Sequence, residues 1–395
     1  MRKVGKLIIL VVLLGMVFPS WARAHGKGRG KLVDLGADPT KIEVEWVKEL
    51  PPAWAYETAW SVGGEHFVLS NHVYDKDGRR VGNWWDRLRY QMAYGEKYLH
   101  VERVREMDGT WTYKINLGDL ATHKEKVLYV VERLDVDKVG MKPDGSKLWF
   151  TWTEKVREEK GGKRILRYKT YLRIVNLSDW KEMEIELPGS KEKPQCTPGP
   201  WCPDEIWRDA NAYGYTMEDT VLIEDPVLDK TFLYDPYTRK KIVDGVASAP
   251  YVINGRSYVS TRRLKKRIDR RGRTIWAWDY IDGKGKMIFK NAEWEWSSPD
   301  EKEFENAMVF PNLKLFLYVK QRALKGNFDD DDVVIKLTYF VSDRNVIKKK
   351  KIFEYIIDFG KNPSYRCESI SPQGDRVLIE NTSGKSYLIK LRRVR

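Results

Sequence analysis

The chain has 395 residues, of which 42% are hydrophobic and 12% are aromatic. This length and apolar content suffice for one large domain or two smaller ones, and they exclude the class of chains that are too polar to form a buried hydrophobic core. The formal net charge of +14 favours anionic partners such as nucleic acid, acidic polymers of a cell envelope or lipid headgroups, although solubility alone would also account for it. Charged residues reach 32% and Gln occurs only four times, a composition typical of thermophile proteins with ion-pair networks.

The first 24 residues have the pattern of a secretory signal peptide. Three cations precede the apolar run LIILVVLLGMVF, and the segment ends on Ala22-Arg23-Ala24, with small residues where a signal peptidase needs them. The pattern predicts cleavage after Ala24 and export to the periplasm or the extracellular space. The run is short for a membrane-spanning helix, which needs about 20 apolar residues, so an uncleaved anchor is the less favoured alternative and no stable membrane insertion is expected after cleavage. Residues 25–40, rich in Gly and Lys, are expected to form a flexible basic tether.

Two of the three cysteines lie close together. Cys196 and Cys202 belong to the proline-rich stretch KPQCTPGPWCPDE. In an oxidising compartment, a close pair on a stiff turn predicts a disulfide bond. The six-residue spacing fits neither CxxC redox chemistry nor a zinc knuckle. Cys367 precedes an apolar strand and is expected to be a buried free thiol.

A short motif recurs along the chain. Residues 141–150 (MKPDGSKLWF) and 370–379 (ISPQGDRVLI) align without a gap, and residues 60–69 (WSVGGEHFVL) fit the same frame. In the first two, Pro presets the angle of the turn and Gly supplies the positive-φ position that lets the chain reverse. Alternating apolar residues then bury one face of a strand. The motif therefore predicts a strand–turn–strand hairpin.

Weaker copies of this hairpin bring the number of candidates to seven, centred near residues 64, 95, 145, 218, 255, 312 and 374. Their mean spacing is about 50 residues, near the 40–50 that is typical of propeller blades. After the apolar run near the start, no stretch shows a sustained helical stripe. We therefore expect an all-β fold, a β-propeller of about seven blades in a single domain over residues 41–395. Six or eight blades, or a pair of β-sandwiches, stay open as alternatives.

The two ends of this domain are predicted to meet. Residues 41–47 alternate apolar and charged side chains, as a half-buried strand does. The C-terminal region offers only three strands for a last four-stranded blade. An N-terminal strand paired with residues 386–392 would complete that blade and close the ring, which removes an exposed sheet edge.

The Pro-Asp-Gly hairpin resembles the blade motif of WD40-like propellers of the TolB type, whose consensus approximates Ser-Pro-Asp-Gly-x-x-apolar-x-Phe. Residues 141–150 and 370–379 match it best, and Trp60-Ser61 is similar to its Trp-Ser opening. The resemblance implies a propeller fold. It says little about activity, because this fold hosts binding proteins and enzymes alike.

Candidate catalytic groups are carboxylates near aromatic residues. Asp204, Glu205 and Asp209 flank a Trp just after the cysteine loop, and Asp279 and Glu293 also have aromatic neighbours. Paired carboxylates beside aromatic rings suit the hydrolysis of glycosides, provided that two or three of them converge at the central channel of the expected propeller. A charged loop without catalytic function is the favoured alternative. The five histidines (25, 66, 72, 100 and 123) are scattered, and we expect neither a metal ion nor a cofactor.

One segment is strongly basic. Residues 262–273 carry eight cations and one acid between two strand-like stretches, which predicts a hairpin with a cationic tip that could bind a polyanion. A solvated hairpin without a ligand is the alternative. The eight cations are Arg262, Arg263, Lys265, Lys266, Arg267, Arg270, Arg271 and Arg273.

These features favour an exported, non-catalytic β-propeller that binds a protein or an anionic polymer of the cell envelope. The alternative is a secreted carbohydrate-active enzyme, a hydrolase or a lyase, on the same fold. The identity of the partner and the oligomeric state do not follow from the sequence.

Overall fold

The computed structural model describes residues 32–53, 59–83, 90–132, 134, 136–192, 203–246, 251–253, 255–261, 267–268, 274–297, 302–326, 333–358, 366–381 and 384–395. Within these ranges the chain consists of β-strands, turns and loops, with one short 3-10 helix, η2 (Pro39–Lys41). No helix in this part of the chain is both long and apolar enough to cross a membrane.

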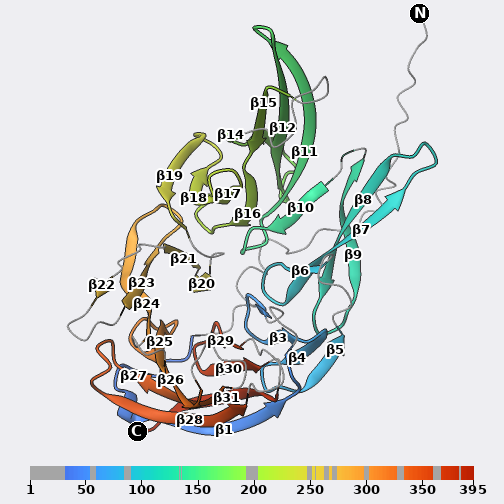
Figure 1. Ribbon diagram of the computed structural model, residues 1–395. Helices are drawn as coiled ribbons and strands as arrows, with labels where there is room; N and C mark the ends of the chain where they lie inside the picture. Colours follow the sequence, from blue (N-terminus) through green and yellow to red (C-terminus); the bar gives the residue numbers. More distant parts are fainter. Residues whose placement is uncertain are drawn as a thin grey trace, which may run out of the picture.

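Among the described strands, four of the sheets have four strands each (Figure 1). In three of them the strands follow one another along the chain as a meander, and in the fourth an N-terminal strand joins three C-terminal strands. The first consists of β2 (Ala59–Trp60), β3 (His66–Leu69), β4 (His72–Asp75) and β5 (Arg80–Asn83). The second consists of β6 (Tyr90–Met92), β7 (Lys97–Arg105), β8 (Trp111–Asp119) and β9 (Glu125–Glu132). The third consists of β16 (Asn211–Tyr215), β17 (Val221–Asp225), β18 (Lys230–Asp235) and β19 (Lys240–Asp244). The fourth consists of β29 (Arg366–Ile370), β30 (Arg376–Asn381), β31 (Ser386–Arg393) and β1 (Ile42–Leu50).

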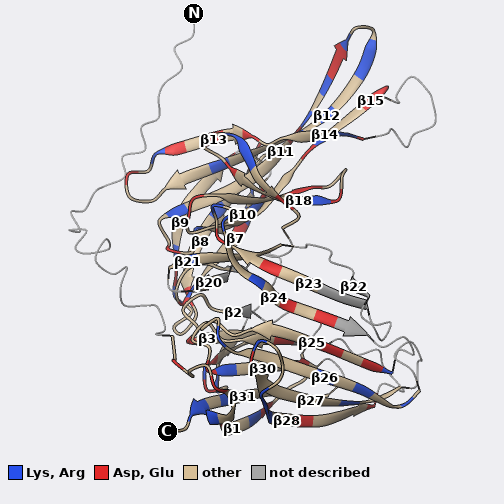
Figure 2. Ribbon diagram, turned by 90° about the vertical axis from the view of Figure 1, so that its left-hand side faces the viewer, with Lys and Arg blue, Asp and Glu red and all other residues tan. Residues whose placement is uncertain are grey.

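A larger, six-stranded sheet contains a meander of four strands and two additional strands on its projecting end. The meander is β10 (Val136–Met141), β11 (Lys147–Lys160), β12 (Lys163–Asn176) and β13 (Glu182–Glu186). The additional strands are β14 (Gly189–Glu192) and β15 (Glu205–Asp209), of which β15 runs parallel to the start of β12. The β11–β12 hairpin extends beyond the body of the molecule and carries charges of both signs (Figure 2).

The last sheet has nine strands and joins two meanders edge to edge. The first meander is β20 (Tyr251–Ile253), β21 (Arg256–Thr261), β23 (Thr274–Ile281) and β24 (Met287–Ser297), with β22 (Arg267–Ile268) paired to β23. The second is β25 (Glu303–Val309), β26 (Phe316–Lys325), β27 (Val334–Ser342) and β28 (Lys349–Asp358). Strands β24 and β25 pair antiparallel and so make the two meanders continuous.

The meanders stand around a central axis with their first strands innermost (Figure 1). This arrangement is a β-propeller, so the all-β propeller fold expected from the sequence is confirmed. The described residues form seven buried apolar clusters between the meanders, among them one around Phe150 and one around Tyr339. Dividing the nine-stranded sheet between β24 and β25 gives seven four-stranded units among the described strands.

The ring closes between its two ends. Strand β1 pairs antiparallel with β31, with Ile42 opposite Arg393 and Leu50 opposite Ser386. The prediction that an N-terminal strand completes the C-terminal sheet is therefore confirmed. Ile42 is fully buried in the core cluster that this sheet shares with β26 and β27, so the closing strand contributes apolar contacts as well as backbone hydrogen bonds.

Residues 32–40 correct one expectation, because they are not a free tether. Leu35 is 1% exposed and belongs to the same core cluster as Ile42. The amide of Val33 donates to the carbonyl of Gln373 at 2.9 Å, and the side-chain amide of Asn312 donates to the carbonyl of Gly36 at 3.1 Å. One buried Leu and these hydrogen bonds fix a stretch that its composition marks as mobile. Residues 25–31 and the signal segment lie outside the described residues.

All seven predicted hairpins are present as the turn between the first and second strands of a four-stranded unit, and we call these the inner turns. Four of them, including the turn that begins at Phe310, repeat one hydrogen-bond pattern. The amide of Lys142 donates to the carbonyl of Lys147, and the amide of Gly145 donates back to Lys142, both at 2.8 Å. The inner turns that begin at Ser61 and Ser371 are built in the same way. Gly145 has φ = +77°, a conformation that an L-residue adopts only with strain.

Neighbouring inner turns contact one another around the axis. The side-chain amide of Gln373 donates to the carbonyl of Gly63 at 2.8 Å, and the amide of Gly63 donates to Gly95 at 2.9 Å. Farther round the ring, Lys142 forms an ion pair with Asp219 at 2.9 Å. These contacts join successive meanders at one end of the axis, and that end carries the cavity described next.

Candidate functional site: an axial cavity at the inner turns

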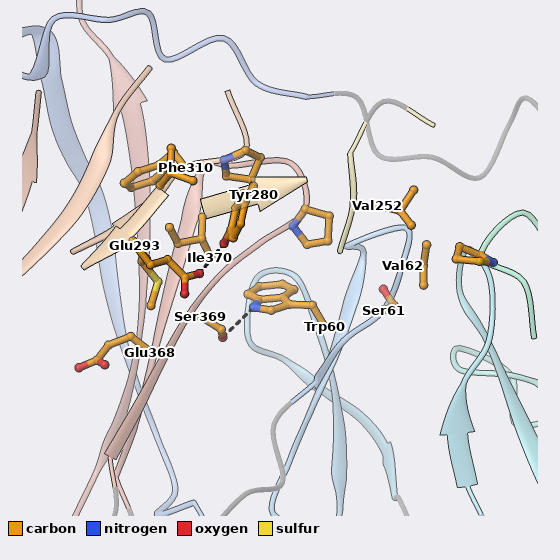
Figure 3. Close-up of a pocket in the computed structure, with 15 residues that line it drawn as sticks. Trp60, Ser61, Val62, Val252, Tyr280, Glu293, Phe310, Glu368, Ser369 and Ile370 are labelled. Atoms are coloured by element: carbon orange, nitrogen blue, oxygen red, sulfur yellow. Dashed lines mark hydrogen bonds between the residues drawn. The ribbon is translucent and has the colours of Figure 1, made fainter. Parts of the chain in front are cut away.

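A cavity of about 230 Å³ lies at the axis, where the inner turns meet (Figure 3). Val62, Pro143, Pro311 and Pro372 reach it from the inner turns of four different meanders. Residues from so many meanders line one cavity only at the propeller axis. We call it the axial cavity.

Aromatic and other apolar side chains form most of its wall. Trp60, Tyr280 and Phe310 all line it. The Trp60 ring packs on Phe67, with 4.9 Å between ring centroids, and its indole N–H donates to the hydroxyl of Ser369 at 3.1 Å. The hydrogen bond and the ring contact hold the indole in one orientation, so its exposed part faces a preformed space (Figure 3).

Glu293 is the acidic group that points toward Trp60 across this space (Figure 3). It lies on β24, the last strand of its meander, yet it reaches the axis because β24 pairs with β25 and sets Glu293 opposite Met308. The hydroxyl of Tyr280 donates to its carboxylate. Burial raises the pKa of Glu293, and the hydrogen bond from Tyr280 offsets only part of that effect.

A second carboxylate, that of Glu368 on β29, also lines the cavity but is directed away from Trp60 (Figure 3). It accepts a hydrogen bond of 3.0 Å from the hydroxyl of Tyr339. Tyr339 is completely buried, so this contact ties Glu368 to the core beneath β29. Of the two carboxylates, Glu293 is therefore the one presented to a ligand.

The three acids that the sequence placed first as catalytic candidates lie elsewhere, at the base of the projecting hairpin. Asp204 accepts from the backbone amide of Arg164 at 2.7 Å. Glu205 forms ion pairs with Lys191 and Lys163 at 2.7 and 3.0 Å, and these cations lower the pKa of Glu205 to about 2.

Asp209, the third of these acids, is buried, and burial raises its pKa. It accepts from the amide of Thr170 at 3.2 Å and lies 3.5 Å from Arg167. All three acids hold β15 against β12, and none lines the axial cavity. Asp279 is likewise buried and accepts from the amide of Asn291 at 2.8 Å. Glu293 is the one member of the five candidates that reaches the cavity.

Several predicted features fall outside the described residues. These are Cys196, Cys202, the N-terminal His25 and the cations Arg262, Arg263, Lys265, Lys266, Arg270, Arg271 and Arg273. The backbone of Arg267 belongs to β22, which pairs with β23 opposite Ile275, as expected for a hairpin in this segment. Cys367 lies on β29.

The histidines are dispersed over the first two meanders. His66 contacts Glu96 at 2.7 Å, His72 contacts the carbonyl of Ser70 at 2.6 Å, and His100 contacts Glu125 at 2.9 Å. Among the described residues, no three His, Cys, Asp or Glu side chains are grouped so that they could hold a metal ion.

The comparisons with known proteins concern the fold. No protein-family model and no curated protein matches the chain. Among solved structures, the β-propeller domain of Cps50 (Swd1) from Myceliophteria thermophila is 10% identical, with a TM-score of 0.37 over 88% of this chain and 99% of that one. An oligogalacturonate lyase from Vibrio parahaemolyticus is 10% identical, with a TM-score of 0.38 over 88% and 97%.

The β-propeller domain of the Trilobed protease from Pyrococcus furiosus, described as having an open velcro topology, is 11% identical, with a TM-score of 0.29 over 77% of this chain and 94% of that one. The present chain closes its ring by the pairing of β1 with β31. With its repeated hairpins, its radial meanders and this closure, the chain is, at the level of fold, a β-propeller.

Proposed function

We propose that the protein is an exported, non-catalytic β-propeller that binds a protein of the cell envelope at the axial cavity. The observation that carries this proposal is the cavity itself, a preformed space walled by Trp60, Phe310 and three prolines at the end of the axis. Its volume of about 230 Å³ is below the roughly 300–1,000 Å³ of pockets that enclose a whole small-molecule ligand. A space of this size suits one side chain of a larger partner that rests on the inner turns.

We infer export from the signal pattern of residues 1–24. A partner in the cell envelope is proposed because an exported protein meets that compartment. The cationic segment 262–273 adds a second, independent contact for an anionic polymer. A protein partner at the axial cavity meets a rigid surface, because the inner turns there are hydrogen-bonded to one another.

Selection of peptides tests the proposal. Random peptides displayed on phage are selected against the exported protein, and the enriched peptides are then titrated against two variants. Val62→Trp fills the cavity from an inner turn, whereas Val127→Trp adds the same bulk at a site on β9 that is 56% exposed. We expect enriched peptides that bind the wild type and the Val127→Trp variant alike and lose at least tenfold in affinity for Val62→Trp. Failure to enrich any peptide, or equal binding to both variants, would contradict the proposal.

The second candidate is a secreted carbohydrate-active enzyme, and one observation favours it. Glu293 has the raised pKa of a general acid, and Glu368 lines the same cavity. Such an enzyme requires both carboxylates to flank the glycosidic bond. Release of new reducing ends from a polysaccharide by the wild type, abolished in Glu293→Gln, would establish this function in place of binding.

A further inference from the structure

The charge of the axial cavity is opposite to that of the chain. The described residues that line it include two Glu and no Lys, Arg or His, although the chain as a whole carries a net charge of +14. An anionic ligand would therefore meet a carboxylate at this cavity without a compensating cation. The lining favours a cation instead.

Among the residues that the structure describes, none supplies Glu293 with the cation that buried carboxylates ordinarily have. Its partner is the neutral hydroxyl of Tyr280, and among the described residues no Lys, Arg or His forms an ion pair with it. Placing a carboxylate in an apolar environment without a counter-ion is costly, and that cost raises the pKa of Glu293. An incoming cation would recover part of this cost, which makes Glu293 a strong site for one.

Buried cations at the inner turns are, by contrast, already paired. Lys142 contacts both Asp144 and Asp219, at 3.4 and 2.9 Å. Arg376 contacts Asp375 at 2.7 Å and Asp77 at 3.0 Å. These two cations therefore already have acidic partners, and the carboxylate at the axis is the group that differs.

The aromatic walls suit the same ligand. The rings of Trp60, Tyr280 and Phe310 line the cavity together with Glu293. A Lys or Arg side chain has an apolar stem that can lie along such rings and a cationic head that is attracted to their faces. The head can then reach the carboxylate while the stem fills the rest of the space.

We infer that the axial cavity accepts the side chain of a Lys or Arg presented by the partner protein, with its cationic head against Glu293 and its stem between Trp60 and Phe310. This inference rests on the proposed function and names the chemistry by which that site recognises its partner. It assigns to the axis a preference for cations that is opposite to the one expected from the net charge.

Matched peptides test it. Blocked pentapeptides with Gly around one central residue are titrated against the exported protein by calorimetry, with Lys, Arg, norleucine or citrulline at the centre. Norleucine keeps the stem of Lys without its charge, and citrulline keeps the shape of Arg without its charge. We expect the Lys or Arg peptide to bind at least tenfold more tightly than its neutral counterpart. Equal binding of charged and neutral peptides would overturn the inference.

Two variants test whether the carboxylate of Glu293 is the group that prefers the charged peptides. Glu293→Gln keeps the size of the side chain and should remove the preference for the charged peptides. Glu305→Gln, on the adjacent strand β25 and outside the cavity lining, is the matched control and should keep that preference. A preference that survives in Glu293→Gln would overturn the inference. Thermal unfolding of both variants verifies that they are folded.

The outcomes separate this inference from the proposed function. Phage-selected peptides that bind at the cavity but contain no Lys or Arg would overturn the inference and leave the proposed function standing. Absence of any peptide blocked by Val62→Trp would overturn both. Free agmatine that binds more tightly than the Arg peptide would point to a small amine as the ligand and would overturn the assignment to a partner protein.

Discussion

Glu293 lies directly opposite Met308, although the two residues belong to successive meanders of the propeller. The first is on the last strand of its meander and the second is on the first strand of the next. Their pairing turns two meanders into one nine-stranded sheet and carries a carboxylate from an outer strand to the axis. The chemistry of the axial cavity thus depends on a departure from the repeat.

The position of Glu293 predicts a gain of stability in Glu293→Gln that grows with pH. Burial raises the pKa of Glu293, so the folded state holds this proton more tightly than the unfolded chain does. Ionisation therefore destabilises the wild type as the pH rises above the unfolded pKa of about 4.3, whereas Gln does not ionise. The melting temperature of the variant relative to the wild type should be higher at pH 8 than at pH 4.

In the described part of the chain, the titratable groups around Glu293 are Tyr280 on β23, Glu295 on β24 and Glu368 on β29, and these are unchanged in the variant. Glu305→Gln, on the neighbouring strand, is the control for the loss of a carboxyl group. A difference in melting temperature that is the same at both pH values would contradict the burial of Glu293.

Closure of the ring predicts unequal effects of two substitutions on β1. Ile42 is fully buried against the core, whereas Val47 on the same strand is 41% exposed. Ile42→Ala should lower the free energy of unfolding by about 2–5 kcal/mol, because it leaves a cavity in the closing sheet. Val47→Ala should change it by less than about 1 kcal/mol. Urea unfolding measures both values, and similar losses would show that β1 does not close the core.

Local patterns explain why the fold could be predicted from the sequence. The inner turns depend on Pro and Gly within a few residues, as at Gly145 and Gly374, and the closing strand depends on the alternation around Ile42. Such signals need no knowledge of distant contacts. The pairing of Glu293 with Met308 has no such signal, because a strand that bridges two meanders has the same alternation as one within a meander.

The positions of the candidate acids also depend on long-range strand pairing, which local patterns do not predict. Asp204 and Glu205 lie near aromatic residues in the sequence, but that proximity does not tell which strand β15 will pair with. Its parallel pairing with β12 places these acids beside Lys163 and Arg164, where they form ion pairs. Leu35 was missed for a related reason, since one apolar residue among Gly and charges gives no periodic pattern.

Two glycines with similar backbone angles, Gly145 in an inner turn and Gly109 between β7 and β8, should lose different amounts of stability when each is replaced by Ala. Gly145 and Gly109 have φ of +77° and +83°, so each variant should lose about 1–2 kcal/mol through backbone strain. At Gly145 the added Cβ would also lie 2.7 Å from the ring of Tyr94, whereas at Gly109 nothing lies within 4 Å. Gly145→Ala should therefore be the more destabilised by about 1–3 kcal/mol in urea unfolding. Equal losses would show that the contact with the Tyr94 ring adds nothing to the strain.

Mass measurement of the exported protein tests both the cleavage of the signal peptide and the bonding of the cysteine pair. Protein collected outside the cytoplasm of its host should begin at His25 and lack residues 1–24. Under non-reducing conditions Cys196 and Cys202 should be bonded, and a thiol reagent should label one cysteine, Cys367, after unfolding. A mass that includes the apolar run, or three labelled cysteines, would contradict one part or the other.

The cationic segment predicts a salt-dependent affinity for polyanions that is separate from the axial cavity. Each cation that neutralises a phosphate or sulfate releases a counter-ion, so the slope of log K against log salt reports the number of such contacts. Replacing five cations by Gln should weaken binding to heparin and flatten that slope. The five replaced residues are Arg262, Arg263, Lys265, Lys266 and Arg267. Replacing Lys348 and Lys350, which lie in another basic run, is the control, and heparin binding that is equally tight and equally salt-sensitive in the fivefold variant would exclude residues 262–267 as the polyanion contact.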